Sequence, residues 1–437
     1  MASIQEGRTG GKTAEVDAST GKQQDNAIVK RVLDTNPLLE AFGNATTLRN
    51  DNSSRFGKYL QLQFDSMFRG GSVAPAILAG SKCEVYLLEK SRVTHHHPSE
   101  RTYHIFYQLL SAPEFLKVAI WDGLADTDAE SFCYVGITES DSPSATMGII
   151  EGKTDAERFQ QTLEALELIG VQGTILQMLL RAICVVLQLG NLEFAPASSP
   201  QGNPSAMTAL GLAIHHPPGG NTDASEISSL EELQDLSELM GMGDIDPNQD
   251  NVSPTLKTAL TVRSVEARGE VFAVPLTPEK AKESADAFAK EIYAKTFLWL
   301  VRTINDATCA EKNYTRTSSP RALSTQYGII GLLDIFGFET FEVNRFEQLC
   351  IYYCNEKLQQ KFTQDIFRSV QVEYENEGIE LEEITYDDNT DALDLVEGRM
   401  GLLAFLNEEC VRPKGSDKTF VYKSEAMKKD NPCFFRD

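Results

Sequence analysis

Two polar motifs, far apart in the chain, contain the residue types that hold and sense the γ-phosphate of a nucleotide. The first motif, residues 50–57 (NDNSSRFG), offers amides, hydroxyls and a guanidinium. The second motif, residues 334–339 (DIFGFE), follows an apolar run with an aspartate, a glycine and a glutamate. Each motif interrupts an apolar context, so together they predict a nucleotide site if the fold brings them to one place.

In the first motif, each polar residue suits a different part of that chemistry. Ser54 can give its hydroxyl to Mg²⁺, which prefers hard oxygen ligands, and Ser53 can hold an attacking water. Asn50 and Asn52 can donate to phosphate oxygens, and Arg55 can form a bidentate pair with a carboxylate. On the motif alone, an ordinary polar turn remains an alternative.

The second motif has the pattern of a strand-end carboxylate near a metal ion. Asp334 follows a run that ends a strand, which is where a Walker-B aspartate lies. Gly337 would let a backbone amide approach the γ-phosphate, because glycine has no Cβ in the way. Glu339 is the natural partner for Arg55, and the pair would form a two-state latch when the two loops close. A plain strand end is the alternative for Asp334.

The elements that must position these motifs alternate between strands and helices. Residues 59–64 alternate apolar and polar, which predicts a strand directly after the first motif. Residues 328–336 form a continuous apolar run, typical of a strand buried on both faces. Helical spacing occurs over residues 28–42 with a new helix at Pro37, over 103–110, over 159–189 with a break near 171–173, over 284–304 and over 346–372. The sequence therefore predicts a mixed α/β fold with attached helical lobes.

Composition narrows the functional classes. The 437 residues, 41% apolar and 24% charged, can bury more than one core. No apolar run reaches the roughly 18–20 residues of a membrane span, and residues 1–30 lack the apolar core of a signal peptide. A net charge of −24 argues against nucleic acid as a general partner, so an anionic filament would have to meet a local basic patch. The eight cysteines show no CxxC pair, which favours buried thiols in a reducing compartment.

The two motifs and their flanks resemble the motor domain of myosin, an unconventional myosin heavy chain. Residues 36–45 running into the first motif look like the family's switch I region, and the second motif looks like switch II. Residues 87–93 (LLEKSRV), 100–110 (ERTYHIFYQLL) and 346–360 (FEQLCIYYCNEKLQQ), the last like the start of the relay helix, also match. The resemblance runs from about Asn36 to Lys414. Kinesins share a similar Ser-Ser-Arg switch, but their second switch differs after the aspartate.

This resemblance implies roles for the motif residues. Ser54 would bind Mg²⁺, Asp334 would hold a metal-bound water, and Gly337 would donate its amide to the γ-phosphate of ATP. Arg55 and Glu339 would close the gate behind the phosphate. All of these roles require Arg55 and Glu339 to face each other across a shared anion pocket.

The resemblance also implies an actin-binding surface. Residues 267–271 look like the surface loop that touches actin, with Arg268 and Glu270 as contacts. In this family an acidic residue at the Glu270 position implies that no phosphorylation is needed for actin engagement. Residues 390–413, with Leu406 and Glu408, resemble the helix-turn-helix of the lower lobe that grips actin.

The chain departs from the family pattern at both ends. Residues 7–13 (GRTGGKT) do not fit a Walker-A loop, because Glu6 stands where its first glycine should be and polar sequence surrounds them. We expect this segment to be the flexible loop that follows the phosphate-loop helix, with the true phosphate loop upstream of Met1. No converter or light-chain-binding helix follows before Asp437, so light chains and cargo would be reached only through other regions.

The expected organisation is a P-loop-NTPase-like central sheet, incomplete, with large helical upper and lower actin-binding lobes. A flexible segment would cover residues 1–30, and an upper lobe with switch I would cover 31–330, including a disordered insertion at about 195–228. Switch II and the relay helix would cover 331–380, and a partial lower lobe would cover 381–437. We expect low solubility, because a sheet without its central strand exposes apolar surface and unpaired edges.

The sequence thus predicts an incomplete actin-based motor that binds and hydrolyses Mg·ATP, located in the cytoplasm on the cytoskeleton as part of a myosin complex. A non-catalytic actin-binding or scaffolding remnant is the alternative, so whether this chain is an enzyme stays open. An unrelated α/β protein would require the ordered motif blocks to be coincidental. Two further patterns could suggest a metal site, but a structural role is favoured for each. His95, His96 and His97 are adjacent residues in a loop. Cys350 and Cys354 lie on one helix without other metal-binding partners, which favours buried packing.

Overall fold

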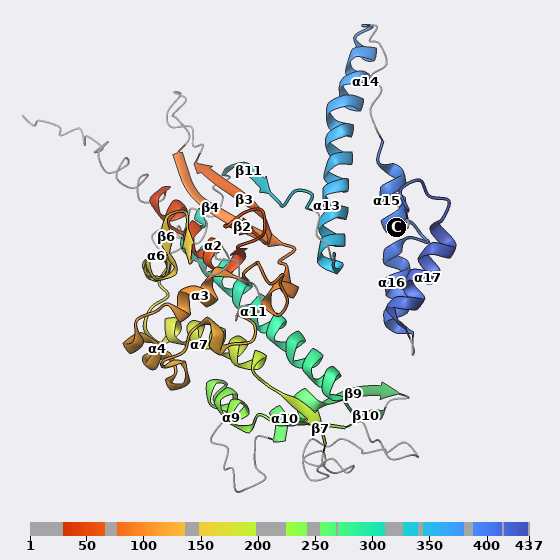
Figure 1. Ribbon diagram of the computed structural model, residues 1–437. Helices are drawn as coiled ribbons and strands as arrows, with labels where there is room; N and C mark the ends of the chain where they lie inside the picture. Colours follow the sequence, from red (N-terminus) through yellow and green to blue (C-terminus); the bar gives the residue numbers. More distant parts are fainter. Residues whose placement is uncertain are drawn as a thin grey trace, which may run out of the picture. The chain divides into compact units, whose positions relative to one another are not determined.

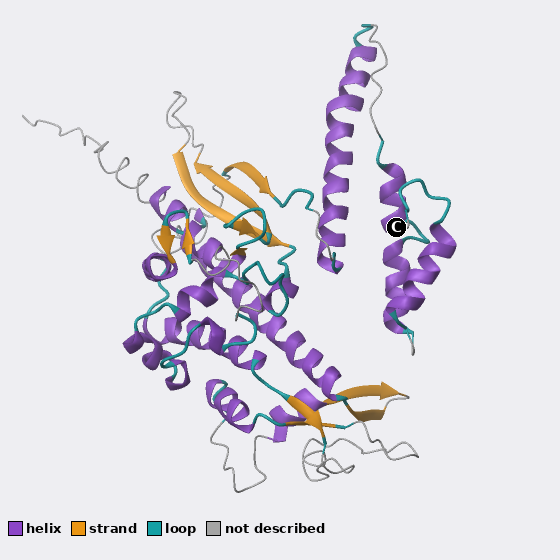
Figure 2. Ribbon diagram, in the orientation of Figure 1, coloured by secondary structure: helices purple, strands orange, loops and turns teal. Residues whose placement is uncertain are grey.

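The computed structural model describes residues 29–65, 77–135, 148–197, 224–242, 254–267, 270–310, 327–339, 344–379, 388–412 and 415–435. The chain divides into two compact units, Met1–Asp334 and Ile335–Asp437, here called the first unit and the second unit. Helices and strands are mixed in the first unit, whereas the described part of the second unit contains helices and loops (Figures 1 and 2). The mixed α/β content agrees with the sequence-based prediction.

A three-stranded sheet stands behind the first motif. It consists of β3 (Gly57–Asp65), β4 (Ile77–Tyr86) and β11 (Gly328–Asp334) in the order β11-β3-β4, and both pairings are antiparallel. The strand predicted after the first motif is therefore confirmed. A parallel central sheet of the P-loop type is not confirmed, since all strand pairings among the described residues are antiparallel.

The strand before the second motif is present, but its predicted burial on both faces is wrong. Every residue of β11 is exposed, and four apolar side chains remain about half accessible: Ile329, Ile330, Leu332 and Leu333. The main described neighbour of β11 is β3, and pairing with a strand covers an edge of β11 rather than its two faces. An apolar strand edge of this kind is a template for further pairing.

One long helix, α11 (Pro278–Thr308), packs between the sheet and the other helices of the first unit. Figure 1 shows it running from the sheet to the hairpin of β9 (Val262–Ala267) and β10 (Glu270–Pro275). It packs on β4, α2 (Asn36–Gly43) and α7 (Gly173–Gly190). Asn305 uses its side-chain amide to bind both the N–H and the C=O of Cys83 on β4, each at 2.7 Å. Phe297 meets Phe56, the residue before β3, edge to face at 5.1 Å between centroids. The position of β3 is thereby tied to the core.

The other elements of the first unit follow the helical periods of the sequence. Pro37 lies in the first turn of α2, as expected, and the predicted break near residues 171–173 separates α6 from α7. The helices are α2 (Asn36–Gly43), α3 (His104–Leu110), α4 (Glu114–Ile120), α6 (Asp155–Leu168), α7 (Gly173–Gly190), α9 (Leu230–Leu239) and α10 (Pro254–Thr261), with 3₁₀ turns at Lys90–Val93, Asp122–Leu124 and Ala129–Ser131. The short strand pairs are β1 (Asn44–Ala45) with β2 (Ser53–Ser54), β5 (Ile149–Ile150) with β6 (Lys153–Thr154), β7 (Phe194–Pro196) with β8 (Ser225–Ile227), and β9 (Val262–Ala267) with β10 (Glu270–Pro275).

Helix α7 corrects one expectation from composition. Its 18 residues have a mean hydropathy of 1.6, so by length and composition alone it is apolar enough to cross a membrane. Its second half is buried in the core of the first unit, together with side chains of α3, α9 and α11. Packing of this kind is typical of the central helix of a folded domain.

The second unit begins with a helix that matches the predicted long helix. It consists of α13 (Phe346–Thr363), a π-helical turn (Gln364–Arg368) and α14 (Ser369–Asn376) without interruption. Three further helices follow: α15 (Thr390–Glu397), α16 (Leu402–Val411) and α17 (Asp417–Lys428). Helices α15 and α16 supply the expected pair of helices joined by a turn.

Candidate functional site

The first motif closes a short loop between α2 and β3. Asn44 and Ala45 of β1 pair with Ser54 and Ser53 of β2, and the Arg55 N–H donates to the Gly43 carbonyl at 2.8 Å. A Cβ on Gly43 would lie 2.3 Å from the Phe56 ring, so glycine is what allows the two sides of the loop to approach. The loop is therefore held by backbone contacts at its base before any side chain of the motif is considered.

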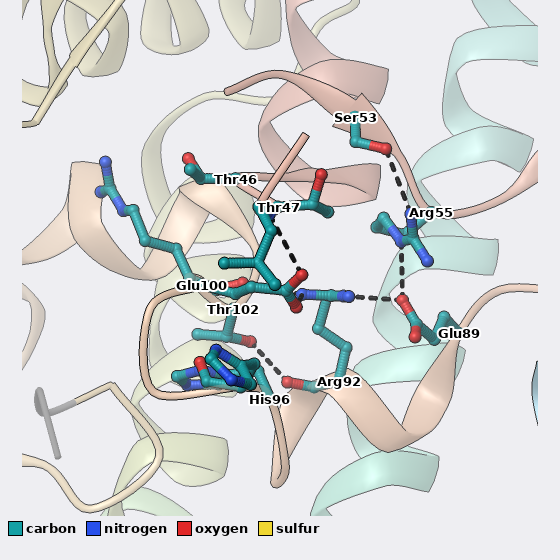
Figure 3. A network of polar contacts seen from close by, with 12 residues as sticks. Thr46, Thr47, Ser53, Arg55, Glu89, Arg92, His96, Glu100 and Thr102 are labelled. Atoms are coloured by element: carbon teal, nitrogen blue, oxygen red, sulfur yellow. Dashed lines mark hydrogen bonds and ion pairs between the residues drawn. The ribbon is translucent and has the colours of Figure 1, made fainter. Parts of the chain in front are cut away.

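A buried chain of alternating charges lies behind this loop (Figure 3). Arg55 Nε donates to Glu89 Oε2 at 2.7 Å, Arg92 Nε donates to the same oxygen at 2.6 Å, and Arg92 Nη1 donates to Glu100 Oε2 at 2.9 Å. The Arg55 side chain is 0% exposed, and the other three side chains are at most 7% exposed. We call Arg55, Glu89, Arg92 and Glu100 the buried ion chain.

The buried ion chain begins and ends on the same loop. At one end, Arg55 Nη1 donates to Ser53 Oγ at 3.1 Å. At the other end, the Leu48 N–H donates to Glu100 Oε1 at 3.2 Å, and the Arg101 N–H donates to the Thr46 carbonyl at 3.0 Å. Thus one continuous path of polar contacts holds both sides of the segment that contains the first motif.

Mutual neutralisation explains how four charges can be buried together. Burial by itself raises the pKa of Glu89, but the charges of Arg92 and Arg55 outweigh it and hold that pKa below its usual value. Burial opposes the charge of Arg92 as well, yet Glu89 and Glu100 raise its pKa. Removing any member of the chain would leave a buried charge without full compensation.

Asn52 is the second anchor of the loop. Its Oδ1 accepts from Asn44 Nδ2 at 3.0 Å and lies 3.2 Å from His104 Nε2, while its Nδ2 donates to Glu151 at 3.0 Å and to Glu40 at 3.4 Å. Asn50 is exposed at the surface of the loop and accepts from the Asn52 N–H at 2.9 Å. A phosphate contact by Asn52 would require some of these contacts to be exchanged.

Antiparallel pairing brings the start of β3 and the end of β11 to the same end of the sheet. Asp334 is the register partner of Lys58, and their side chains form an ion pair at 3.2 Å. Lys58 also lines a cavity of about 140 Å³ together with Ser54, Asn44 and Glu40. The structure therefore places the end of the first motif and Asp334, far apart in sequence, at the same end of the sheet.

The hydroxyl and carboxylate near this end of the sheet are of the chemical kind that Mg²⁺ prefers. Ser54 Oγ donates its proton to Asn44 Oδ1 at 3.2 Å, which leaves the hydroxyl lone pairs for a cation. The Asp334 side chain is 63% exposed and is paired with Lys58, so a metal-bound water would have to displace that lysine. Hydroxyl and carboxylate oxygens are hard ligands, and Mg²⁺ normally completes its shell with phosphate oxygens and water.

The remaining residues of the second motif lie in the second unit. Among the described residues, and apart from its own chain neighbours, no atom lies within 4 Å of a Cβ built on Gly337. Phe338 stacks on Tyr352 of α13 at 6.3 Å, and the Tyr352 hydroxyl donates to the Glu339 carbonyl. The carboxylate that the structure places at Arg55 is Glu89, and the pairing of Arg55 with Glu339 stays a prediction.

The candidate actin-contact residues are spread over both units. Arg268 lies outside the described residues, as does the segment 7–13, and Glu270 is the first residue of β10. In α16 of the second unit, Leu406 is half-buried and Glu408 is exposed, with an ion pair to Lys423 of α17.

Sequence reasoning missed Glu89, Arg92 and Glu100 as parts of the site. Glu89 and Arg92 lie within residues 87–93, and Glu100 begins residues 100–110, but these segments served only as points of resemblance. The sequence signal for a buried ion pair was the presence of charged residues next to apolar ones, with Glu89 and Arg92 three residues apart. Nothing in that spacing shows that both would meet Arg55.

Comparison with known proteins identifies the class to which this fold and site belong. The sequence model of the family "Myosin head (motor domain)" matches residues 12–436. The chain is 38% identical over 414 residues to unconventional myosin-Ic of Rattus norvegicus, covering 94% of this chain and 34% of that protein. It is 39% identical to unconventional myosin-Ic of Bos taurus, with the same coverage, and 35% identical over 400 residues to myosin-52 of Schizosaccharomyces pombe, covering 92% and 23%.

The chain therefore belongs to the myosin head (motor domain) family. It spans about a third of the length of the unconventional myosin-Ic proteins that it matches.

Proposed function

We propose that this chain is part of an actin-based motor that binds Mg·ATP between the first and second motifs and couples hydrolysis to actin binding. The observation that supports this most directly is the register of β11 with β3, which pairs Asp334 with Lys58, four residues after Ser54. In a member of the myosin head family, these are the positions at which a metal–phosphate group would be held. We expect such a motor to be located in the cytoplasm, on actin filaments.

In this proposal each residue has one task. Ser54 and, through water, Asp334 hold Mg²⁺, which would neutralise developing charge on the phosphate oxygens. Ser53 positions the attacking water, since its oxygen accepts from Arg55 and its own proton remains available to a neighbour. Asn50 and Asn52 contact phosphate, the Gly337 amide approaches the γ-phosphate, and Arg55 with Glu339 closes the gate.

Actin would be met by residues from both units. The proposed contacts are Arg268 and Glu270 at the β9–β10 hairpin, and Leu406 and Glu408 on α16. Val411, at the end of α16, is 81% exposed, and it lines a shallow hollow with Ala404, Asn407, Glu408 and Arg412. Apolar and charged groups exposed together are typical of a protein-binding surface.

A second candidate is a non-catalytic actin-binding or scaffolding protein. This candidate is favoured because the side chains proposed to bind Mg·ATP already contact other protein groups. Ser54 contacts Asn44, Asp334 contacts Lys58, and Asn52 contacts four neighbouring side chains. Nucleotide binding would have to displace several of these contacts, whereas actin binding would displace none.

Three measurements on the 437-residue chain separate the two candidates: binding of a fluorescent ATP analogue with Mg²⁺, ATPase rate with and without actin, and co-sedimentation with actin filaments. The motor proposal expects all three to be positive and expects Ser54→Ala to weaken Mg²⁺-dependent binding. The matched control is Ser369→Ala, which removes an exposed hydroxyl from α14 of the second unit. Sedimentation with actin but no nucleotide binding would support the second candidate.

A further inference from the structure

A cavity that the proposed function does not use lies beside the loop of the first motif. Its volume is about 200 Å³, and its walls come from α2, α3, α6 and the β5–β6 hairpin. Each of the three helices packs on the other two, so the fold of the first unit fixes these walls. Liquid water occupies about 30 Å³ per molecule, so this cavity, here called the polar cavity, has room for a ligand of roughly seven non-hydrogen atoms.

Two polar side chains that line the polar cavity are more than nine-tenths buried. Gln108 is 1% exposed, and its Oε1 accepts from Thr162 Oγ1 at 2.8 Å, whereas its Nε2 makes no hydrogen bond to any described residue. Arg158 is 7% exposed, and within the described residues its guanidinium makes a single hydrogen bond, from Nη2 to Glu40 Oε2 at 3.2 Å. Buried donors of this kind need an acceptor, because leaving them without one costs free energy.

Two more donors line the polar cavity. Lys153 is exposed and Gln161 is half-buried, and within the described ranges neither side chain forms a hydrogen bond or an ion pair. Together with Gln108 and Arg158, they offer a bound carboxylate more donors than it can use.

Two carboxylates line the same cavity. Glu40 accepts through Oε2 from Arg158 and, at 3.4 Å, from Asn52, and Glu151 accepts through Oε1 from the Asn52 amide at 3.0 Å. The other oxygen of Glu151 lies 3.8 Å from Arg158 Nη1, which is too long for a hydrogen bond. In the described part of the chain, Oε1 of Glu40 and Oε2 of Glu151 are therefore open to a donor.

The backbone holds Glu151 here in a conformation that glutamate seldom adopts. Glu151 and Gly152 form the two-residue turn between β5 and β6, with φ of +53° and +79°. Positive φ at both positions is the pattern of a type I′ turn, in which asparagine or aspartate before glycine is favoured. Residues held in such uncommon conformations cluster at functional sites. The turn therefore supports a role for the Glu151 carboxylate.

Charge balance selects the class of ligand. Arg158 and Lys153 balance the two carboxylates, so the lining of the polar cavity has no net charge. A simple anion would meet the carboxylates and a simple cation would meet the basic groups, and either would add a net charge to this site. A small zwitterion adds none, and its two ends match the open donors and the open oxygens.

We propose that the polar cavity binds a small zwitterion of the amino-acid class. Its carboxylate accepts from Arg158 and the other open donors, and its ammonium donates to the open oxygens of Glu40 and Glu151. The ammonium then shares both carboxylates with the Asn52 amide. The ligand thus contacts the anchor of the first motif without entering the proposed Mg·ATP site.

Matched probes test this class on the 437-residue chain in the absence of nucleotide. L-Serine suits the volume of the cavity, whereas 3-hydroxypropionate lacks its ammonium and ethanolamine lacks its carboxylate. Ligand-observed NMR titration should give a dissociation constant of about 1 mM or lower for L-serine, and roughly tenfold weaker binding for each of the other two. No binding of L-serine at about 10 mM, or equal affinity for L-serine and either partial analogue, would overturn the proposal.

Three variants locate the binding at the polar cavity. Arg158→Met removes the buried cation and should weaken L-serine binding by roughly tenfold or more. Lys153→Met should weaken it by about threefold, and it changes an exposed side chain, so folding is retained. Gln161→Phe keeps all four charges but fills the cavity, so it should abolish binding. Unchanged affinity in a folded Arg158→Met or Gln161→Phe chain would overturn the proposal.

Lys280→Met is the matched control for Lys153→Met, because it removes an exposed lysine of α11 that does not line the polar cavity. Its affinity for L-serine should equal that of the wild-type chain. An equal loss in the two lysine variants would show an unspecific effect of net charge and would overturn the assignment. Since every titration omits nucleotide, failure of the proposed Mg·ATP site would leave this result as it stands.

Discussion

The first and second motifs both interrupt apolar sequence, yet the structure builds them differently. Arg55 in the first motif is fully buried and belongs to a chain of four charges, whereas Asp334 in the second is 63% exposed and pairs with a lysine that is itself 31% exposed. Hydrogen bonds to the buried ion chain hold both sides of the loop that contains the first motif. In contrast, β11, which leads to the second motif, is exposed along its whole length. Polar residues that interrupt apolar sequence can therefore serve as a rigid anchor or as an accessible contact.

This contrast suggests a division of labour within the proposed site. Buried, mutually compensated ion pairs fix a geometry, because any displacement exposes a charge to a poor environment. Exposed groups with few packing contacts change partners at little cost. We therefore expect the first motif to act as the fixed side of the gate and the second motif as the side that moves.

The largest effect should come from breaking the buried ion chain. Arg55→Met leaves Glu89 with a single arginine, and we expect a loss of about 3–5 kcal/mol in the free energy of unfolding. Chemical denaturation followed by circular dichroism measures it. Lys58→Met is the matched control from the second motif's ion pair and should cost less than about 1 kcal/mol, because that pair is solvent-exposed. Equal losses from the two variants would remove the contrast.

A smaller effect is expected from the framework beneath the first motif. Tyr293 of α11 is buried, stacks on Tyr103 at 4.7 Å and donates its hydroxyl to the Phe42 carbonyl at 2.8 Å. Tyr293→Phe leaves that buried carbonyl without this donor, which should lower the unfolding free energy by about 1–2 kcal/mol. Thermal melting measures the change. Tyr422→Phe alters a side chain that is 75% exposed and should be neutral; a matching loss there would count against the buried contact.

The burial of His104 beside Asn52 should appear as a pH dependence of stability. Burial, followed by the charges of Arg101 and Arg158, holds the pKa of His104 well below its usual 6.5. As the pH falls below 6.5, the unfolded chain therefore binds a proton that the folded chain does not, and stability decreases until the folded pKa is reached.

Replacing His104 tests that decrease. We expect His104→Gln to flatten the fall in unfolding free energy between pH 7 and 5, by at most about 1.4 kcal/mol per pH unit. Denaturation at several pH values gives the slope. His95→Gln removes an exposed histidine and should leave the slope as it is in the wild-type chain; identical slopes for all three proteins would refute the assignment.

The smallest change in stability is expected on the exposed strand. Ile330 of β11 is 53% exposed on an edge strand, so Ile330→Lys should alter the unfolding free energy by less than about 0.5 kcal/mol. Self-association should nevertheless fall, because a charge on an apolar edge opposes strand-to-strand pairing. Size-exclusion chromatography at several concentrations tests this, with Ile330→Val as control. A wild-type chain that is monomeric throughout would disprove the expectation of low solubility.

Much of the local structure was predictable from the sequence. The strand after Gly57, the helix that begins near Pro37 and the break between α6 and α7 follow from alternation, proline and glycine, which act over a few residues. The burial of β11 was not predictable in the same way. An apolar run indicates a strand, but whether that strand is covered depends on which elements pack against it.

The sequence by itself determined the chemistry on offer: the hydroxyls, amides and guanidinium of residues 50–57, the aspartate that ends β11, and membership of a recognisable family. Only the tertiary structure decided which of these groups meet. Glu89, Arg92 and Glu100 converge behind Arg55 because the loop, β4 and the turn after β4 close on one another, and Asp334 reaches Lys58 because β11 pairs antiparallel to β3. Such contacts join residues that are distant in the chain, and local periodicity carries no information about them.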